Sequence, residues 1–325
     1  MSKKFNNKIL LAILAGLLIV FVLVKWYNIT KTESTIHTDI VDFDSTSITK
    51  LALYPASNKQ EEILFTKEKN AWKLSSGKII TVPDPQALKN LISTLYEIKP
   101  QRLVAKDKNK WAEFQVADTN ATHIKVYEGS QVVLDLFIGK FTYQQSREPN
   151  GQMSGAGGII GTSYVRLNGE EEIYAVNGFL TFSFNQSFNT FRNQSITRLE
   201  KPNINKFSIK FPGDSSFIAE KTNGKWLIDN ALADSTKIDA YLNELANKTS
   251  DSFNDQYKPI GIPTYQLFVE TSDKKKISID AYTNGENQWV LNSSTNPKSW
   301  FSSGYNEVFG DLFKPKSYFL DVGKK

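Results

Sequence analysis

The segment Lys69-Asn70-Ala71-Trp72-Lys73-Leu74 has a second version later in the chain, Asn223-Gly224-Lys225-Trp226-Leu227-Ile228. In each, a turn-forming residue precedes a short run around one tryptophan, a pattern typical of a hairpin strand. Upstream of each, an alternating strand opens with Ile48-Thr49-Lys50-Leu51 or Ile204-Asn205-Lys206-Phe207. This ordered recurrence predicts two related structural units.

The similarity continues downstream of both tryptophans. Asp84 and Asp234 each precede an apolar helical stripe, and an aspartate at this position accepts bonds from free amide groups at the helix start. The two stripes are Leu88, Leu91, Ile92 and Leu95, then Ile238, Tyr241, Leu242 and Leu245. Two later strand pairs also correspond: 124–128 with 267–271, and 132–138 with 275–281. Small loop deletions explain why the offset falls from 156 at Ile48 to 143 at Ile124.

These patterns predict an α+β fold made of two similar antiparallel-sheet-plus-helix units, at residues 45–196 and 197–320. Each unit should contain three strands, an N-capped helix, several further strands and a closing aromatic helix. We expect the helices to cover one face of each sheet.

A transmembrane helix is expected before the two units. Ile9 to Val24 has 16 residues without a polar side chain, and extending the helix through Tyr27 gives about 28 Å, enough to cross the hydrocarbon. Residues 1–27 are therefore predicted to be a cytoplasmic stub and signal-anchor, and 28–44 a linker. The alternative is a cleaved signal peptide, but the bulky Lys25-Trp26-Tyr27 does not resemble a cleavage site.

Charge supports this topology. Lys3, Lys4 and Lys8 place the N-terminus in the cytoplasm and the rest outside, in a single-pass arrangement at the cell (inner) membrane with a periplasmic or extracytoplasmic ectodomain. The first 27 residues hold four of the 39 Lys and Arg and no acid, which leaves 35 basic against 34 acidic residues. A nearly neutral ectodomain argues against nucleic-acid binding. The absence of cysteine excludes thiol catalysis, disulfides and cysteine metal sites.

Several of these motifs resemble a known family. The Lys-x-x-Trp-x-Leu strand, the Asp-headed leucine helix, Phe137-Ile138-Gly139 and Tyr164-Val165-Arg166 before Tyr174-Ala175-Val176 are similar to bacterial envelope proteins known only as a domain of unknown function. The resemblance covers nearly all of residues 45–320. Its members are often encoded beside ABC-transporter components similar to gliding-motility auxiliary proteins, which implies a transporter-associated accessory role. The family has no agreed catalytic residues, so none is assigned.

A glycine-rich loop from Asn150 to Thr162 is the main difference between the units, since the second unit has only the turn 284–287 there. Its glycine spacing matches neither a P-loop nor a dinucleotide fingerprint. It is either a hairpin insertion or a binding loop. The candidate binding residues are Arg147, Glu148, Gly151, Gly155, Gly157, Gly158 and Gly161.

Other candidate sites have structural interpretations. Trp72 and Trp226 are either core residues or ligand platforms, and their recurrence favours the core. The aromatic stripes at 180–191 and 305–313 either close their own units or dock into a partner, with recurrence again favouring the former. His37 and His123 are the only histidines, so no metal, cofactor or catalytic site is predicted.

Three functions are compatible with the sequence. A non-enzymatic accessory or scaffold subunit of an envelope transport system agrees best with the anchor and the neutral ectodomain. A glycan- or peptidoglycan-binding module is the alternative, suggested by the aromatic content and the glycine-rich loop. A hydrolase that uses only carboxylates is the third, and requires two acids facing each other across a cleft.

Overall fold

The computed structural model describes residues 16–21, 40–41, 43–145, 158–213 and 215–320. The predicted anchor and linker lie mostly outside these ranges, although residues 16–21 are helical. In the described part of the chain, no helix combines the length and apolar character needed to cross a bilayer. Ile40 and Phe43 are already buried in the first core, so the folded unit begins earlier than the predicted linker boundary.

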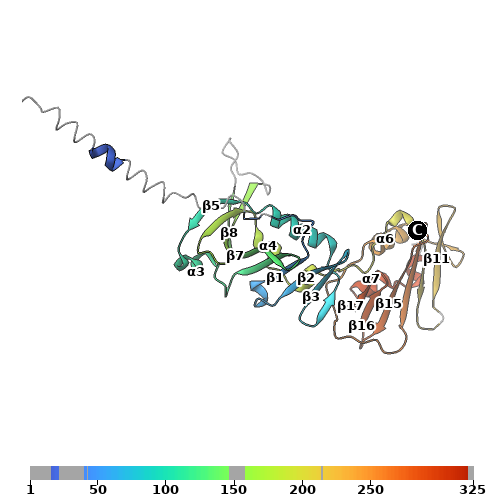
Figure 1. Ribbon diagram of the computed structural model, residues 1–325. Helices are drawn as coiled ribbons and strands as arrows, with labels where there is room; N and C mark the ends of the chain where they lie inside the picture. The colour runs from blue at the N-terminus through green and yellow to red at the C-terminus, as the bar shows by residue number, and fades with distance from the viewer. Residues whose placement is uncertain (1–15, 22–39, 42, 146–157, 214, 321–325) are drawn as a thin grey trace, which may run out of the picture.

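Two antiparallel sheets with helices form the structure, which confirms the predicted α+β class (Figure 1). The first sheet has the strand order β4 (Ile79–Thr81), β3 (Ala71–Ser76), β2 (Ile63–Glu68), β1 (Lys50–Tyr54), β6 (Thr122–Glu128), β7 (Gln131–Gln145), β8 (Ile159–Leu167), β9 (Ile173–Asn177), β5 (Pro100–Ala105). The second has the order β13 (Ala231–Leu232), β12 (Lys225–Ile228), β11 (Phe217–Thr222), β10 (Ile204–Lys210), β14 (Tyr265–Thr271), β15 (Lys276–Thr283), β16 (Gln288–Ser293), β17 (Asn296–Gly304).

Without the edge strand β5, the two strand orders correspond one to one. The register corresponds too. Leu51 pairs with Phe65 and Val126, and at the same positions Phe207 pairs with Ala219 and Val269. Each unit has four strands before its first long helix rather than the predicted three, because β4 and β13 extend the tryptophan hairpins.

The first unit contains α2 (Pro85–Tyr96), α3 (Trp111–Phe114), α4 (Leu180–Phe184) and α5 (Phe188–Phe191), and the second contains α6 (Ser235–Ala246), α7 (Val308–Leu312) and α8 (Lys316–Leu320). The long helices begin as predicted. Asp84 Oδ1 accepts bonds from two amides of α2 at 2.9 and 2.8 Å, and Asp234 does so for α6 at 2.8 and 3.2 Å. In each unit the capping aspartate's own amide donates to the carbonyl of a buried closing phenylalanine, Phe191 or Phe319.

The closing aromatic segments differ from the single helices that the sequence predicts. Leu180, Phe184 and Phe191 are buried in the first core, but Asn185–Ser187 interrupts the helix and divides it into α4 and α5. At this interruption, Asn185 Oδ1 accepts a hydrogen bond from the Ser57 amide at 2.8 Å and the Asn185 carbonyl accepts one from the Ser57 hydroxyl at 3.3 Å. The second unit is likewise closed by two short helices.

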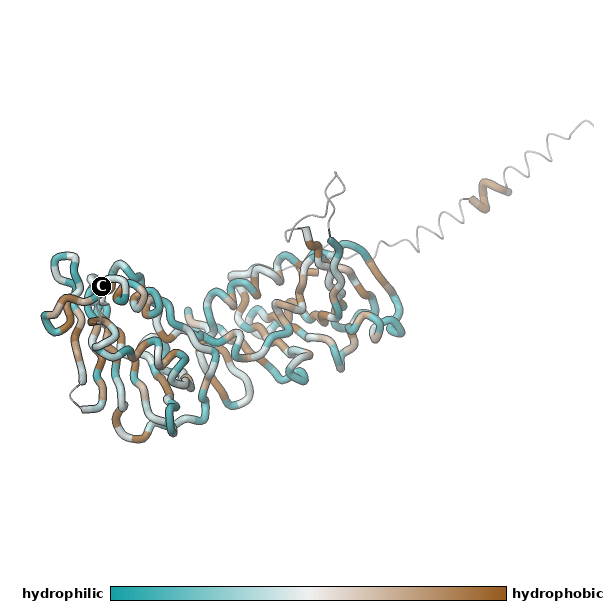
Figure 2. Tube along the Cα trace, turned by 180° about the vertical axis from the view of Figure 1, so that it is seen from behind, coloured by the Kyte–Doolittle hydropathy of each residue, from teal (hydrophilic) through white to brown (hydrophobic). Residues whose placement is uncertain are grey.

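The main core of each unit lies between its sheet and the long helix. Hydrophobic and hydrophilic residues alternate along the strands of both units (Figure 2). Trp72 and Trp226 are half-buried at the margins of these cores. The opposite face of the first sheet carries a smaller cluster under α3, so helices cover part of both faces there rather than one.

Candidate functional site

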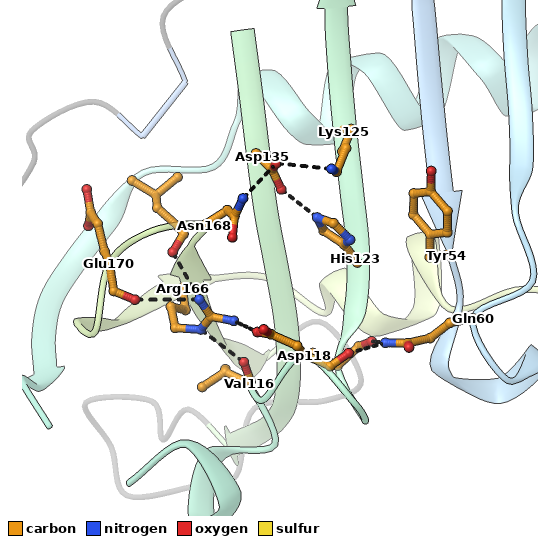
Figure 3. Close-up of polar contacts among 12 residues, drawn as sticks. Tyr54, Gln60, Val116, Asp118, His123, Lys125, Asp135, Arg166, Asn168 and Glu170 are labelled. Carbon is orange, nitrogen blue, oxygen red and sulfur yellow. Dashed lines mark hydrogen bonds and ion pairs between the residues drawn. The ribbon is translucent and has the colours of Figure 1, made fainter. Parts of the chain in front are cut away.

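A row of stacked side chains crosses the outer face of the first sheet, and Figure 3 shows three of its members, Tyr54, His123 and Arg166, with their polar contacts. Tyr54, His123, Phe137 and Arg166 are successive register partners on β1, β6, β7 and β8. The ring centroids of Tyr54 and His123 are 5.3 Å apart, and those of His123 and Phe137 are 4.1 Å apart. The Arg166 guanidinium lies 4.1 Å from the Phe137 ring and 3.8 Å from that of Trp111, which closes the row from α3. Such stacks are favourable because ring faces attract a cation.

Arg166 is almost fully buried, with 1% of its surface exposed. Its Nη2 is bonded to the Asp118 carboxylate, Nε donates to the Val116 carbonyl at 3.1 Å, and Nη1 donates to the Leu167 carbonyl at 3.3 Å. Burial lowers the pKa of Arg166, and the charge of Asp118 partly offsets this. These contacts anchor the 116–118 segment to the sheet, so we interpret Arg166 as a structural residue.

His123 and Asp135 form the second part of this network. His123 Nε2 lies 2.5 Å from Asp135 Oδ1, and Asp135 also receives a bond from Asn168 at 3.0 Å and faces Lys125 at 3.4 Å. Burial by itself would raise the pKa of Asp135, but the bond and charge of His123 outweigh it, and the pKa stays below its usual range. Because Tyr54 and Phe137 cover the imidazole, the pair is held in one orientation. The sequence gives no local signal for the His123–Asp135 pair, because the two residues lie on different strands.

No metal site is found among the described residues, which contain no group of three or more potential ligands. His37 lies outside the described residues. The second sheet does not repeat the row either. At positions equivalent to His123, Phe137 and Arg166 it has Gln266, Asp280 and Asn292, of which the first two are bonded at 2.9 Å.

The glycine-rich candidate loop is described only at its end. Arg147, Glu148, Gly151, Gly155 and Gly157 lie outside the described residues, and their binding role stays a prediction. Gly158 is half-buried just before β8.

Gly161 belongs to β8 and not to a loop, which corrects the predicted loop end at Thr162. It pairs with Tyr143, and a Cβ there would lie 2.6 Å from the Phe179 ring, so packing requires a glycine.

An apolar groove lies along α2 and is named the α2 groove. Its volume is about 620 Å³, its walls are Trp72 of β3 and Leu88, Ile92 and Tyr96 of α2, and Pro85 closes one end. Residues of α2 and of the tryptophan hairpin, which are separate elements in the sequence, therefore line one surface. This arrangement can accept an apolar ligand, because its walls are mostly hydrocarbon.

A polar cleft of about 900 Å³, the α6 cleft, lies beside the equivalent helix of the second unit. Its lining includes Asn243, Asn247, Thr271 and Asp273, and amide side chains can both donate and accept hydrogen bonds. A bond from the Thr271 hydroxyl lowers the pKa of Asp273, so this carboxylate is suited to accept hydrogen bonds.

Comparison with known proteins gives limited information. No curated protein and no solved structure matches the chain. Residues 154–267 match a family model described as a domain of unknown function (DUF4340). This range runs from before β8 to β14 and so spans parts of both units, a shorter range than the resemblance in the sequence suggests. The similarity therefore supports a family of unknown function for this central segment.

Proposed function

We propose that the protein is a membrane-anchored, extracytoplasmic accessory or scaffold subunit of an envelope transport complex. A binding role is supported by one observation: each unit has a cleft beside its long N-capped helix. The cleft beside α2 is apolar and the cleft beside α6 is polar. Two unlike surfaces on one chain suit a subunit that holds partners. The apolar segment from Ile9 to Val24 and the lysines before it support the anchor and its orientation.

Hydrogen bonds and an ion pair between the units support the scaffold role. Arg192, next to α5, makes two bonds to the Asp255 carboxylate in the second unit, at 2.8 and 2.7 Å. The segment between the units is held further because Asn296 Nδ2 donates to the Asn193 carbonyl at 2.6 Å and Ser293 Oγ to the Ile196 carbonyl at 2.6 Å. Bidentate arginine pairs fix geometry as well as distance.

Co-purification tests the proposal. Full-length protein with a C-terminal tag is extracted from membranes in a mild detergent, and a tagged fragment of residues 1–45 is the control for partners that bind only the anchor. We expect membrane proteins of a transport complex to be recovered with the full chain alone. Recovery of the same proteins with both chains, or of none with either, contradicts the accessory role.

Protease treatment tests the topology. Protease added to intact spheroplasts should digest the ectodomain, whereas an N-terminal epitope should survive until the cells are lysed. An ectodomain that survives in spheroplasts and is lost after lysis contradicts the proposed orientation.

The second candidate function is glycan binding by the α6 cleft. Asn203, Asn243 and Asn247 supply amide groups that can bond to sugar hydroxyls. Sedimentation with purified peptidoglycan should retain the wild type and lose an Asn243→Leu/Asn247→Leu variant. Equal retention of both proteins excludes the cleft as the binding site.

A further inference from the structure

In the α2 groove, Trp72 and Ile92 are half-buried and Tyr96 is exposed, whereas the second unit buries the residues equivalent to Ile92 and Tyr96. The N-caps Asp84 and Asp234 set the equivalence, so Ile92 corresponds to Leu242 and Tyr96 to Ala246. Leu242 and Ala246 are 5% and 4% exposed, whereas Tyr96 is 50% exposed although Phe43 contacts its ring edge-on at 5.7 Å.

The covering segment in the second unit precedes β10. The Leu199 amide donates to the Ala246 carbonyl at 2.8 Å, and Lys201 Nζ donates to Asn243 Oδ1 at 2.8 Å. The C-terminal end of α6 is therefore covered by the segment before β10, whereas among the described residues the equivalent end of α2 is covered only in part, by Phe43.

The rim of the α2 groove carries one charge of each sign. Lys89 and Glu97 both line it, and within the described residues neither side chain has an ion-pair or hydrogen-bond partner. Eight helical residues separate them by about 12 Å, or roughly two turns. A complementary ligand therefore needs an acidic and a basic group at a similar spacing on either side of an apolar surface.

We propose that the α2 groove binds an amphipathic helix of a partner protein, about three turns long. This inference rests on the proposed accessory function and specifies the partner's chemistry. A helix fits better than a strand because β3 is already paired on both sides, with β2 and β4. The ligand's apolar residues at i, i+3, i+4 and i+7 pack against Trp72, Ile92 and Tyr96. Its acidic residue pairs with Lys89 and its basic residue with Glu97.

A designed peptide tests this proposal directly. The probe is a fluorescein-labelled amphipathic peptide of about four turns with a glutamate and a lysine eight positions apart, and a second peptide has these two charges exchanged. Fluorescence anisotropy measures their binding to the full-length chain in nanodiscs, and empty nanodiscs provide the blank for lipid binding.

Ile92→Glu should weaken binding at least about tenfold, because it places a carboxylate on the apolar wall. The matched control is Ile218→Glu on β11, where an isoleucine 47% exposed lies far from the groove in sequence, and it should bind like the wild type. Lys89→Glu/Glu97→Lys should weaken binding of the first peptide several-fold and favour the charge-exchanged peptide, a reversal that misfolding cannot produce. Binding that is absent, or that is unchanged by Ile92→Glu and by charge exchange, overturns the proposal.

Photo-crosslinking in cells separates the possible occupants. With p-benzoylphenylalanine at Ser93 on the groove rim, adducts should map to an amphipathic segment of another protein. Adducts only with a second copy, with residues of the same chain or with lipid overturn the inference. If co-purification finds no complex but the peptides behave as expected, the accessory role fails while the groove's helix-binding chemistry stands.

Discussion

The buried ion pair between Arg192 and Asp255 gives a sharp prediction about stability. Arg192 is 1% exposed, its guanidinium lies 3.5 Å from the Phe253 ring centroid, and its only carboxylate partner among the described residues is Asp255, whose side chain is 27% exposed. The two side chains therefore differ in their access to water. Asp255→Ala leaves a buried cation without a counter-charge, whereas Arg192→Met leaves a carboxylate that water can reach.

This asymmetry sets the expected magnitudes. Asp255→Ala should lower the free energy of unfolding by about 3–4 kcal/mol, the range for a buried charge that loses its partner. Arg192→Met keeps apolar contact with Phe253 and should cost only about 1–2 kcal/mol. The double variant should resemble Arg192→Met, so the coupling energy should equal the Asp255→Ala effect, about 3–4 kcal/mol.

Thermal unfolding of the full-length chain, followed by tryptophan fluorescence, measures these effects. For a cooperative unit of about 150 residues, roughly the size of the first unit, about 3 kcal/mol corresponds to a decrease in Tm of about 6–12 °C. Because the pair joins the two units, Asp255→Ala should also divide one transition into two. If Arg192→Met costs more than Asp255→Ala, or if the two changes are additive, the argument from unequal burial is wrong.

Two further changes test local packing and charge. Gly139→Ala should lower the free energy of unfolding by about 1–3 kcal/mol, because the added Cβ would lie 2.1 Å from the Phe114 carbonyl oxygen. The control is Gly304→Ala, whose added Cβ would have its nearest contact at 3.5 Å and should leave Tm nearly unchanged. Asp135→Asn should cost about 1–2 kcal/mol near pH 7. Its folded-state pKa is lowered, so this contribution is present above the unfolded pKa of about 4 and is lost as the pH falls through the folded value. The unfolding curves of wild type and variant should therefore converge once the pH is below that lowered folded-state pKa.

Local patterns predicted the elements whose signals lie within a few residues. Asp84 and Asp234 cap their helices because a short carboxylate before an apolar stripe is sufficient to start a helix. The prediction of one closing helix over 180–191 was wrong. The spacing of its apolar residues could not reveal that Asn185 is hydrogen-bonded to Ser57, 128 positions away.

The stacked row was not predictable for a similar reason. His123 and Arg166 are 43 residues apart, and they share one row only because β6, β7 and β8 pair in a particular register. A shift of one residue would turn either side chain to the other face of the sheet. The α2 groove also depends on tertiary placement. The sequence indicates that Trp72 is a core residue or a ligand platform, but it does not reveal that Trp72 and Tyr96, which belong to different elements, line one groove.

The difference between the two long helices has a consequence for stoichiometry. They share length, N-cap and position. Among the described residues, however, Ile92 and Tyr96 line a groove that Phe43 covers only in part, whereas Leu242 and Ala246 are covered by the segment before β10. A ligand helix that binds α2 would have to displace the bonds made by Leu199 and Lys201 to reach the same face of α6. Peptide binding should therefore saturate at one helix per chain, even though the chain contains two related units.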